Sequence, residues 1–478
     1  MKILNKYSSM SVQAKAALWY TICNFLQKGI AFIVVPIYVR LLTPAEYGTW
    51  AVFQSWKEIL IIFASLNLYC GVYTKSLVDI QDDRDRYTSS MQGLGTVITI
   101  GLFVLYLFFS QTVQTWLSLS STAMYCLFFY FIVYPAVQFW STRQRVEYKY
   151  KQMVVVTLFI SVLTPAISVL LLTHTDLRAK AVIYGYLLVQ SVFGASFYIY
   201  HFVKGKTFFY SKYWLYALNF NIPLIPHYLS LIVLGQADRI MIKYFCGESD
   251  AGIYSFAYSI GSALIVLMSA INGSLVPWSY EQLRDKVYDK LKQVTNLLCV
   301  FFAVITAIVT LISPEVVRFL GTSAYYEAVY VIPMVALGVY FTFCYNLFST
   351  VEFYYSATRY VMVASCAGAI LKIVLNVFVI PLFGFIAAAF TTLICYFMFM
   401  IMHYIFMKKV CRWEKISEDI FDIKTLAIIS VFAFVVTFVC MLTYSIDILR
   451  YATVIMFCIA IIMFKERFID ALHTMKNK

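Results

Sequence analysis

Long apolar stretches alternate with short polar connections from one end of the sequence to the other. The apolar stretches are about 17–25 residues long, which is the length of an α-helix that crosses a bilayer. The pattern predicts six spans, a basic linker, six further spans and a final pair. The predicted spans are Ala14–Pro36, Tyr47–Tyr73, Tyr87–Phe109, Ala123–Trp140, Val154–Leu172, Ala181–Val203, Trp214–Leu234, Ala251–Pro277, Val294–Ile312, Tyr325–Thr350, Val361–Ile380, Ile386–Met407, Leu426–Tyr444 and Leu449–Phe464.

We therefore predict an all-α, polytopic integral membrane protein with about 14 transmembrane helices. Twelve spans is the alternative, because the last apolar stretch is short. The predicted domains are an N-terminal lobe over 1–203, a cytoplasmic linker over 204–213, a C-terminal lobe over 214–410 and an appended helix pair with a tail over 411–478. Composition agrees, since 62% of the residues are hydrophobic and 13% are charged, whereas about half and about a quarter are usual in soluble domains.

Two stretches share one pattern and predict that the two lobes are internal repeats. The stretch VRLLTPAEYGTWAVFQSW near the start aligns with QADRIMIKYFCGESDAGIYSFAY in the middle, with Gly48 over Gly252 and Trp50 over Tyr254. In both copies an apolar run ends in a cation, a short loop carries acids, and a glycine and an aromatic residue begin the next run. This pattern predicts a helix–loop–helix corner at the membrane surface, used twice.

The distribution of basic residues predicts the orientation and argues against nucleic acid as a partner. The formal charge is +13, but the cations recur between apolar runs and form no single patch. The positive-inside rule places both termini in the cytoplasm. With that orientation, most of the 37 Lys and Arg residues are cytoplasmic; the outer loops hold Arg40, Arg178, Lys180, Arg239, Lys243, Arg318 and Arg450, and the spans hold Lys15, Lys28, Lys57 and Lys372.

Several kinds of chemistry lack support in the sequence. The eleven cysteines form no CxxC pair, and the chain contains no GxxxxGK[ST] phosphate-binding loop, so metal, redox and ATP-hydrolysing sites are not indicated. The connections are too short for a soluble catalytic domain. We expect a protein that is not an enzyme and has no cofactor, with coupling to a proton or sodium gradient left open.

Three lysines within predicted spans are the strongest candidates for a binding site. Lys28, Lys57 and Lys372 each oppose insertion by roughly 2.5–3.5 kcal/mol at the bilayer centre unless water, a partner or an anion compensates the charge. Asn24 and Asn376 lie four residues from Lys28 and Lys372 and share a helix face with them. We predict that these residues line a cationic cavity between the lobes. The alternative is structural: one lysine pairs with nearby acids, one extends to the interface and one satisfies a helix contact.

Other polar residues in the spans are candidates for coupling and motion. Glu58 and His227 are titratable and suit proton coupling. Side chains of adjacent residues on a helix point about 100° apart, so we expect no direct ion pair between Lys57 and Glu58. Pro223 and Pro226 interrupt one predicted span and predict either a hinge or a static kink.

A charged corner is the candidate outer gate. Asp238 and Arg239 close one predicted span at the outer surface, and Arg40 lies at the equivalent corner of the first repeat. These residues either pair across the lobes and gate an outer opening, or form a solvated interfacial ion pair.

The stretches LLTPAEYG, DRIMIKYFCGESDAGIYSFAYSI and VFVIPLFGFIAAAFTTLI resemble the polysaccharide-export branch of the multidrug/oligosaccharidyl-lipid/polysaccharide exporter (MOP) superfamily. Within it, the chain is similar to Wzx-type flippases for O-antigen or capsule repeat units in bacterial inner membranes. This resemblance implies two six-helix lobes around a central cavity and translocation of an undecaprenyl-pyrophosphate-linked oligosaccharide to the outer leaflet by alternating access. It also implies membrane lipids, a polysaccharide polymerase and a chain-length regulator as partners.

Three other functions remain open at this point. An exporter of another lipid-linked glycan, such as a peptidoglycan precursor, fits the same pattern. A MATE-like small-molecule antiporter would need carboxylates inside the spans, where Glu58 is the only clear acid. A membrane glycan polymerase would need a large outer loop with catalytic side chains, which the sequence does not provide.

Overall fold

The computed structural model describes residue 7 and residues 10–476, and within these residues it is all-helical, without a β-strand. Twelve helical segments are long and apolar enough to cross a membrane. Two further helices, Pro44–Ser65 with 22 residues and Asp447–Lys476 with 30 residues, are also of membrane-spanning length. The predicted all-α polytopic membrane fold is confirmed, and the two helix counts differ only in whether this second pair is included.

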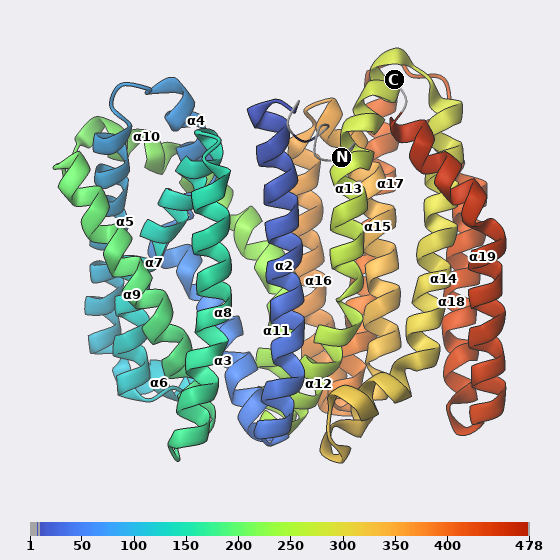
Figure 1. Ribbon diagram of the computed structural model, residues 1–478, viewed down its shortest axis with the longest axis horizontal. Helices are drawn as coiled ribbons and strands as arrows, with labels where there is room; N and C mark the ends of the chain where they lie inside the picture. The colour runs from blue at the N-terminus through green and yellow to red at the C-terminus, as the bar shows by residue number, and fades with distance from the viewer. Residues whose placement is uncertain (1–6, 8–9, 477–478) are drawn as a thin grey trace. The chain divides into compact units, whose positions relative to one another are not determined.

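The chain divides into two compact units, of which unit 1 consists of Met1–Leu42 and Thr49–Gln236. Its helices are α2 (Val12–Leu41), most of α3 (Pro44–Ser65), α4 (Gly71–Asp79), α5 (Arg84–Phe108), α6 (Ser110–Leu117), α7 (Ser121–Val146), α8 (Tyr150–His174), α9 (Ala179–Gly205), α10 (Ser211–Asn221), the short 3₁₀-helix η1 (Ile222–Leu224) and the first half of α11 (Ile225–Cys246). Within this unit α9 packs against α5, α7 and α8, and α2 packs against α8 (Figure 1).

Unit 2 consists of Thr43–Gly48 and Ala237–Lys478. Its helices are the start of α3, the second half of α11, α12 (Glu248–Gly261), α13 (Leu264–Asp285), α14 (Tyr288–Leu320), the 3₁₀-helix η2 (Ser323–Tyr330), α15 (Ile332–Tyr354), α16 (Thr358–Phe383), α17 (Phe385–Trp413), α18 (Ile423–Leu442), the 3₁₀-helix η3 (Thr443–Ser445) and α19 (Asp447–Lys476). The central element is α15, which packs against α12, α13, α14 and α17. In its most apolar stretch of 18 residues, 89% of the residues are buried.

The two corners that share a sequence pattern begin their helices in different ways. At the start of α3, the backbone N–H of Thr43 donates to Glu46 Oε2 over 2.8 Å, and the N–H of Glu46 donates to Thr43 Oγ1 over 3.4 Å. This reciprocal arrangement is a capping box, which satisfies two N–H groups at a helix start. At the start of α12 the chain instead turns through Gly247, whose φ of +101° only glycine adopts readily.

The same two corners contact each other through the glycines that the repeat superimposes. A Cβ on Gly48 would lie 1.9 Å from the backbone oxygen of Glu248, and a Cβ on Gly252 would lie 1.9 Å from the backbone oxygen of Pro44. The contact between the two helix starts is therefore reciprocal. Glycine is required at both positions because the two helix starts approach so closely.

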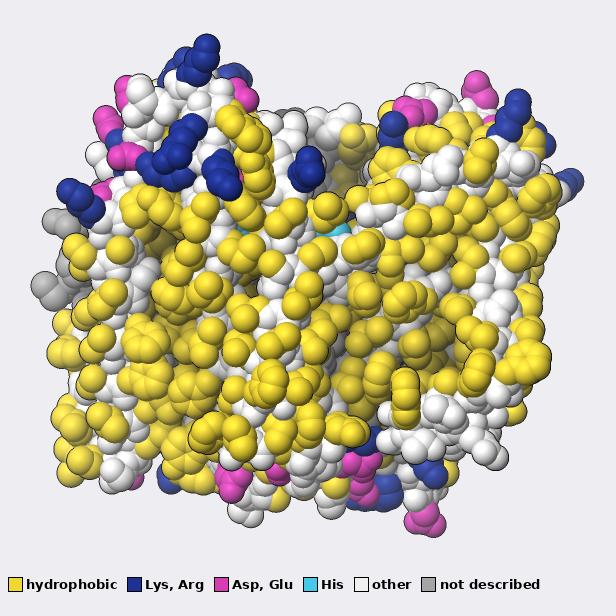
Figure 2. Space-filling view, turned by 180° about the vertical axis from the view of Figure 1, so that it is seen from behind, with side chains coloured by type: hydrophobic (Ala, Val, Ile, Leu, Met, Phe, Trp, Pro, Cys, Tyr) yellow, Lys and Arg dark blue, Asp and Glu magenta, His cyan; other side chains and the backbone are white. Residues whose placement is uncertain are grey.

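The surface reflects the membrane environment. On the face shown in Figure 2, hydrophobic side chains cover the helix bodies, while Lys, Arg, Asp and Glu side chains gather at the helix ends. Large apolar side chains are extensively exposed, including Phe108, Val155, Phe378 and Leu442. Contiguous exposed apolar surface of this kind indicates contact with lipid.

Candidate functional site

Unit 2 contains a fully buried charge cluster centred on Asp238 of α11. The Nζ atom of Lys372 on α16 lies 2.7 Å from Asp238 Oδ2, and the Nδ2 atom of Asn376 donates to Asp238 Oδ1 over 2.8 Å. Tyr254 Oη and Thr392 Oγ1 donate to Oδ2 over 2.6 and 2.9 Å. A single carboxylate thus accepts from four side chains, so the Lys372 charge is compensated by Asp238 within the unit.

This arrangement changes the interpretation of the Asp238 corner. Asp238 is completely buried, so the alternative of a solvated interfacial ion pair does not hold for this residue. The next residue, Arg239, places its guanidinium 4.6 Å from the centroid of the Tyr258 ring. Arg40 is exposed at the end of α2. The gate role assigned to these residues stays a prediction.

Lys57 of α3 is the corresponding buried cation of unit 1. Its Nζ atom donates to Tyr186 Oη over 2.8 Å and lies 4.4 Å from the centroid of the same ring. Glu58 Oε1 lies 3.1 Å from Nζ, so the expectation of no direct ion pair was wrong. The two long side chains bend toward each other despite the angle between their Cβ directions. The Glu58 side chain is 42% exposed, so its charge is partly hydrated.

A polar cavity of about 270 Å³ lies beside Lys57, between α2, α7, α8 and α9 of unit 1. Tyr186 lines it and connects it to the lysine. Hydrogen-bonded polar pairs form much of the wall: Gln138 Nε2 donates to Tyr134 Oη over 2.8 Å, Gln27 Nε2 to Ser161 Oγ over 3.2 Å, and Gln190 Nε2 to Thr164 Oγ1 over 3.2 Å. The exposed Arg145 side chain lines it near the end of α7.

The chemistry of this wall suits a polar, anionic ligand. Amide and phenol groups both donate and accept hydrogen bonds, as sugar hydroxyl groups do, and tyrosine rings offer apolar faces. Arg145 and Lys57 add positive charge. The volume is below the ~300–1,000 Å³ of typical small-molecule sites, so the cavity fits one sugar or phosphate group rather than a whole oligosaccharide.

Lys28 and Asn24 occupy an exposed part of α2. Both side chains are exposed, whereas Cys23 next to them is buried against Trp140 and Met153 of unit 1. Gln27, which precedes Lys28, lines the polar cavity. The convergence of Lys28 and Lys57 with Lys372 on one cavity stays a prediction.

The predicted break at Pro223 and Pro226 is present. The α-helix stops at Asn221, η1 spans Ile222–Leu224, and α11 continues from Ile225. Just after the break, Ser230 Oγ donates a hydrogen bond to the carbonyl of Pro226 over 2.6 Å. Both amide atoms of the buried Asn221 and the Nδ1 atom of His227 lack a hydrogen-bond partner within the described part of the chain. Such unsatisfied polar atoms suit a region that rearranges or admits water.

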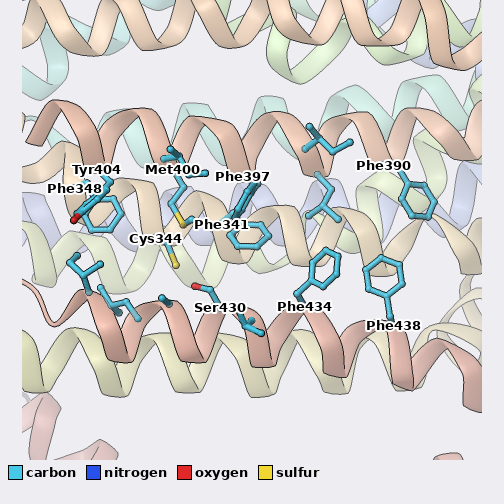
Figure 3. A pocket seen from close by; sticks show the side chains of 17 residues that line it. Phe341, Cys344, Phe348, Phe390, Phe397, Met400, Tyr404, Ser430, Phe434 and Phe438 are labelled. Carbon is cyan, nitrogen blue, oxygen red and sulfur yellow. The ribbon is translucent and has the colours of Figure 1, made fainter.

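An apolar groove of about 680 Å³ lies on unit 2 between α15, α17 and α18 (Figure 3). Figure 3 shows the Phe390, Phe397, Phe434 and Phe438 side chains along it. The α18 residues that line it run from Ile423 to Phe438, a length of about 22 Å at 1.5 Å per residue. Its lining residues are nearly all apolar, and Tyr340 engages the hydroxyl of Ser430 over 3.0 Å.

Two buried acids lie outside the predicted spans, and most of the cavity wall was not predicted. Glu58 was counted as the only clear acid in the spans, but Asp238 and Glu352 lie in membrane-length helices and are fully buried. Glu352 lies two residues beyond the predicted end of its span. Gln138 and Gln190 are isolated polar residues in apolar helices.

These features define a multi-pass helical membrane protein with buried charge pairs and separate polar and apolar sites. Residues 14–282 match the family model for polysaccharide biosynthesis proteins. This match covers more than half of the chain, and the chain therefore belongs to the polysaccharide biosynthesis protein family.

Relatives of similar length occur in bacteria and archaea. An uncharacterized membrane protein of Haemophilus influenzae is 27% identical over 362 residues, covering 71% of this chain and 83% of that protein. The Lsg locus putative protein 1 of the same species is 24% identical over 340 residues, covering 65% and 79%. The uncharacterized membrane protein MJ1068 of Methanocaldococcus jannaschii is 21% identical over 449 residues, covering 84% and 85%.

Solved transporter structures share the fold. The lipid II flippase MurJ in an inward closed conformation matches with a TM-score of 0.65 at 16% identity, covering 94% of this chain and 99% of that one. An inward-facing MATE family transporter of the MOP superfamily matches with a TM-score of 0.62 at 12% identity, covering 82% and 96%. The fold implied by the resemblance to the MOP superfamily, which is that of the MATE transporters, is therefore confirmed. At these identities the matches establish the fold and not the transported molecule.

Proposed function

We propose that this protein is a flippase that moves undecaprenyl-pyrophosphate-linked oligosaccharide repeat units to the outer leaflet by alternating access. The product would serve a surface polysaccharide such as O-antigen or capsule. The observation that carries the proposal is the polar cavity beside Lys57, in a chain of the polysaccharide biosynthesis family. The fold shared with a lipid II flippase supports movement of a lipid-linked molecule.

The cavity in unit 1 would hold part of the polar head group. A pyrophosphate carries at least two negative charges, and attraction to the Lys57 ammonium is strong where water is scarce. Glu58 is partly hydrated, so it can release Lys57 toward a bound anion at small cost. Lys28 and Asn24, beside Gln27 on α2, would contact the same ligand. We give Lys372 and Asn376 a supporting role, since both hold Asp238.

The apolar groove of unit 2 would hold part of the polyprenyl tail. An isoprenoid chain is long, flexible and without polar groups, and the phenylalanine-rich lining offers the matching surface (Figure 3). The head group and the tail would thus use separate surfaces of the protein.

The interruption of the helix at Pro223 and Pro226 would act as the hinge for alternating access. Helices in membranes tolerate such breaks where neighbouring groups or water satisfy the freed backbone. Unpartnered polar atoms on Asn221 and His227, counted over the described residues, support rearrangement here. Arg40 and Arg239 remain candidates for the outer gate, and Glu58 and His227 for ion coupling.

The proposal includes a location and partners. The bias of Lys and Arg residues supports the bacterial cytoplasmic membrane with both termini in the cytoplasm. A polysaccharide polymerase and a chain-length regulator would then act on the product at the outer leaflet. A MATE-like antiport function is less well supported, because Asp238 already holds a lysine and is not available to an external cation.

Lipid extraction from cells that lack the protein tests the proposal. We expect a complete lipid-linked repeat unit to accumulate in the cytoplasmic leaflet while the surface polysaccharide disappears. Mass analysis of that lipid would identify the sugar, and a peptide-bearing lipid would show that a peptidoglycan precursor is the cargo. Lipid that reaches the outer leaflet and stays unpolymerised would contradict the proposal and favour a polymerase.

A further inference from the structure

A second buried pair in unit 2 has no role in the function proposed above. Glu352 of α15 is 0% exposed and His403 of α17 is 1% exposed. The Nδ1 atom of His403 lies 3.0 Å from Oε1 and 3.1 Å from Oε2 of Glu352. The imidazole stacks on the Tyr345 ring at 5.3 Å between centroids, and the Phe399 ring meets its face edge-on at 4.6 Å. The imidazole therefore contacts two aromatic rings and one carboxylate.

The second imidazole nitrogen of His403, Nε2, is buried and makes no hydrogen bond within the described residues. Buried polar atoms without partners are rare in folded proteins and call for a specific explanation. The Glu352 carboxylate at Nδ1 stabilises positive charge on the ring and so favours a proton on Nε2. A proton on Nε2 makes the pair an imidazolium–carboxylate of zero net charge, and its loss leaves a buried net charge of −1.

The other charged groups on neighbouring helices do not compensate this pair. On α12, α13, α14, α16 and α17 the charged side chains that form ion pairs have other partners: Glu248 with Lys243, Arg284 with Asp285, Lys292 with Asp289, Glu315 with Arg450, Lys372 with Asp238, and Lys408 with Asp419. Further basic side chains on these helices are exposed, including Lys290, Arg359, Lys409 and Arg412, and so is Lys424 of α18. The nearest ring neighbours, Tyr345 and Phe399, carry no charge at neutral pH.

We propose that Glu352 and His403 form a proton-binding site that couples a proton gradient to the movement of the transported lipid. The proposal rests on the proposed flippase function. With the proton on Nε2 the pair is neutral and α15 packs closely against α17. Proton release leaves a buried carboxylate without an adjacent cation, which is costly in a dry site, so release requires this part of unit 2 to open to water. Binding from one side of the membrane and release to the other would then drive the cycle in one direction.

Unit 1 offers a matched control for this site. His201 of α9 is also buried, and its Nδ1 atom lies 2.9 Å from Gln92 Oε1. Its partner is a neutral amide, so no carboxylate favours the protonated imidazole. A role that needs only a buried, hydrogen-bonded histidine applies to both sites, whereas a proton-binding role applies to the His403 site alone.

The first test measures protonation directly and does not depend on transport. Full-length protein with ¹⁵N-labelled histidine is placed in lipid nanodiscs, and the imidazole resonances are followed by NMR from about pH 5 to about pH 9. We expect the His403 resonances to respond to pH in the wild-type protein, and Glu352→Gln to weaken the proton affinity of His403 at least about tenfold because the stabilising charge is lost. The His201 resonance should not respond to this substitution. A His403 that keeps one protonation state throughout in the wild-type protein would overturn the proposal.

The second test measures coupling in cells. We expect Glu352→Gln and His403→Gln to raise the lipid-linked intermediate at least about tenfold over wild type, with His201→Gln near wild type. Wild-type export should stop when a protonophore collapses the proton gradient. Glu352→Gln protein that exports at the wild-type rate, with the same protonophore sensitivity, would overturn the proposal. If His403 titrates but cells without the protein accumulate no intermediate, the proton site stands and the flippase function fails.

Discussion

Two lysines that are buried in the described part of the chain, Lys57 in unit 1 and Lys372 in unit 2, differ in the state of their carboxylate partners. Asp238, the partner of Lys372, is 0% exposed and accepts hydrogen bonds from three further side chains. Glu58, the partner of Lys57, is 42% exposed, and a polar cavity lies beside the lysine. A buried cation thus becomes a candidate anion site only where its countercharge can move into water.

The comparison has an energetic basis. Removing one member of a buried ion pair leaves the other uncompensated in a medium of low dielectric constant. A partly exposed pair contributes little, since water replaces the partner. Loss of charge at unit 2 should therefore affect folding first, and loss of charge at unit 1 should affect transport first.

Asp238→Ala should produce the largest effect. It leaves Lys372 without a countercharge and removes the acceptor for Tyr254, Thr392 and Asn376, so we expect roughly 3–5 kcal/mol of destabilisation. Unfolding of the purified protein in detergent measures this loss. The double variant Asp238→Ala/Lys372→Ala is the control and should recover part of the stability. If Asp238→Ala alone is as stable as the wild-type protein, the Asp238 cluster does not stabilise the fold.

Lys57→Gln should separate transport from folding. We expect export to fall at least about tenfold, equivalent to about 1.4 kcal/mol, while the free energy of unfolding changes by less than about 1 kcal/mol. The ratio of lipid-linked intermediate to surface polysaccharide reports export, and the amount of folded protein reports stability. Lys57→Arg is the matched control because it keeps the charge. Unchanged export by the Lys57→Gln variant would contradict a role for Lys57 in binding the head group.

Tyr186→Phe should have a smaller effect at the same site. It removes the oxygen that accepts the 2.8 Å hydrogen bond from Lys57 and keeps the ring. Loss of one hydrogen bond costs about 0.5–1.5 kcal/mol, so we expect export to fall by about two- to tenfold. Tyr130→Phe is the control, because Tyr130 Oη contacts Tyr186 Oη over 3.4 Å, whereas the hydrogen bond from Lys57 goes to Tyr186. Equal losses in both variants would contradict a specific role for the Lys57 contact.

Glu147 lies outside the spans, and its substitution should change the free energy of unfolding least. Burial alone would raise the pKa of Glu147, but hydrogen bonds from Lys149 and Arg143 hold that pKa below its ordinary value. Glu147 therefore stabilises the folded state above the unfolded pKa of about 4.3, and this contribution is lost as the pH falls through the lower folded value.

We accordingly expect Glu147→Gln to cost about 1 kcal/mol at pH 7 and progressively less below about pH 4. Unfolding in detergent across this pH range measures the difference from wild type. A difference that stays constant with pH would show that the Glu147 charge is not responsible.

The fold was largely predictable from the sequence and the site only in part. Apolar stretches specify helices because the bilayer requires backbone hydrogen bonds to be satisfied internally, and the glycines of the repeat were placed correctly in equivalent corners. The shared helix face of Lys372 and Asn376 was a useful signal, since both contact Asp238. Their partner, however, lies more than 130 residues earlier in the chain, and helical spacing carries no information on such contacts.

The polar cavity could not be predicted for a related reason. The sequence does not show whether a glutamine within an apolar helix faces a cavity, a neighbouring helix or lipid. Gln138 and Gln190 are recognised as wall residues only from the packing of α7 and α9. Glu58 illustrates the converse limit, because side-chain length allowed a contact with Lys57 that ideal helix geometry disfavours.

The most direct test of the central claim is photo-crosslinking from the cavity in cells that produce the polysaccharide. A benzoylphenylalanine residue replaces Gln138, and a second protein carries it at Ile370, which is 64% exposed on α16. We predict an adduct that contains phosphate and glycan at position 138, none at position 370, and loss of the adduct when Lys57→Gln is added. A position-138 variant that still exports but yields no glycan adduct would contradict the claim that this cavity holds the head group.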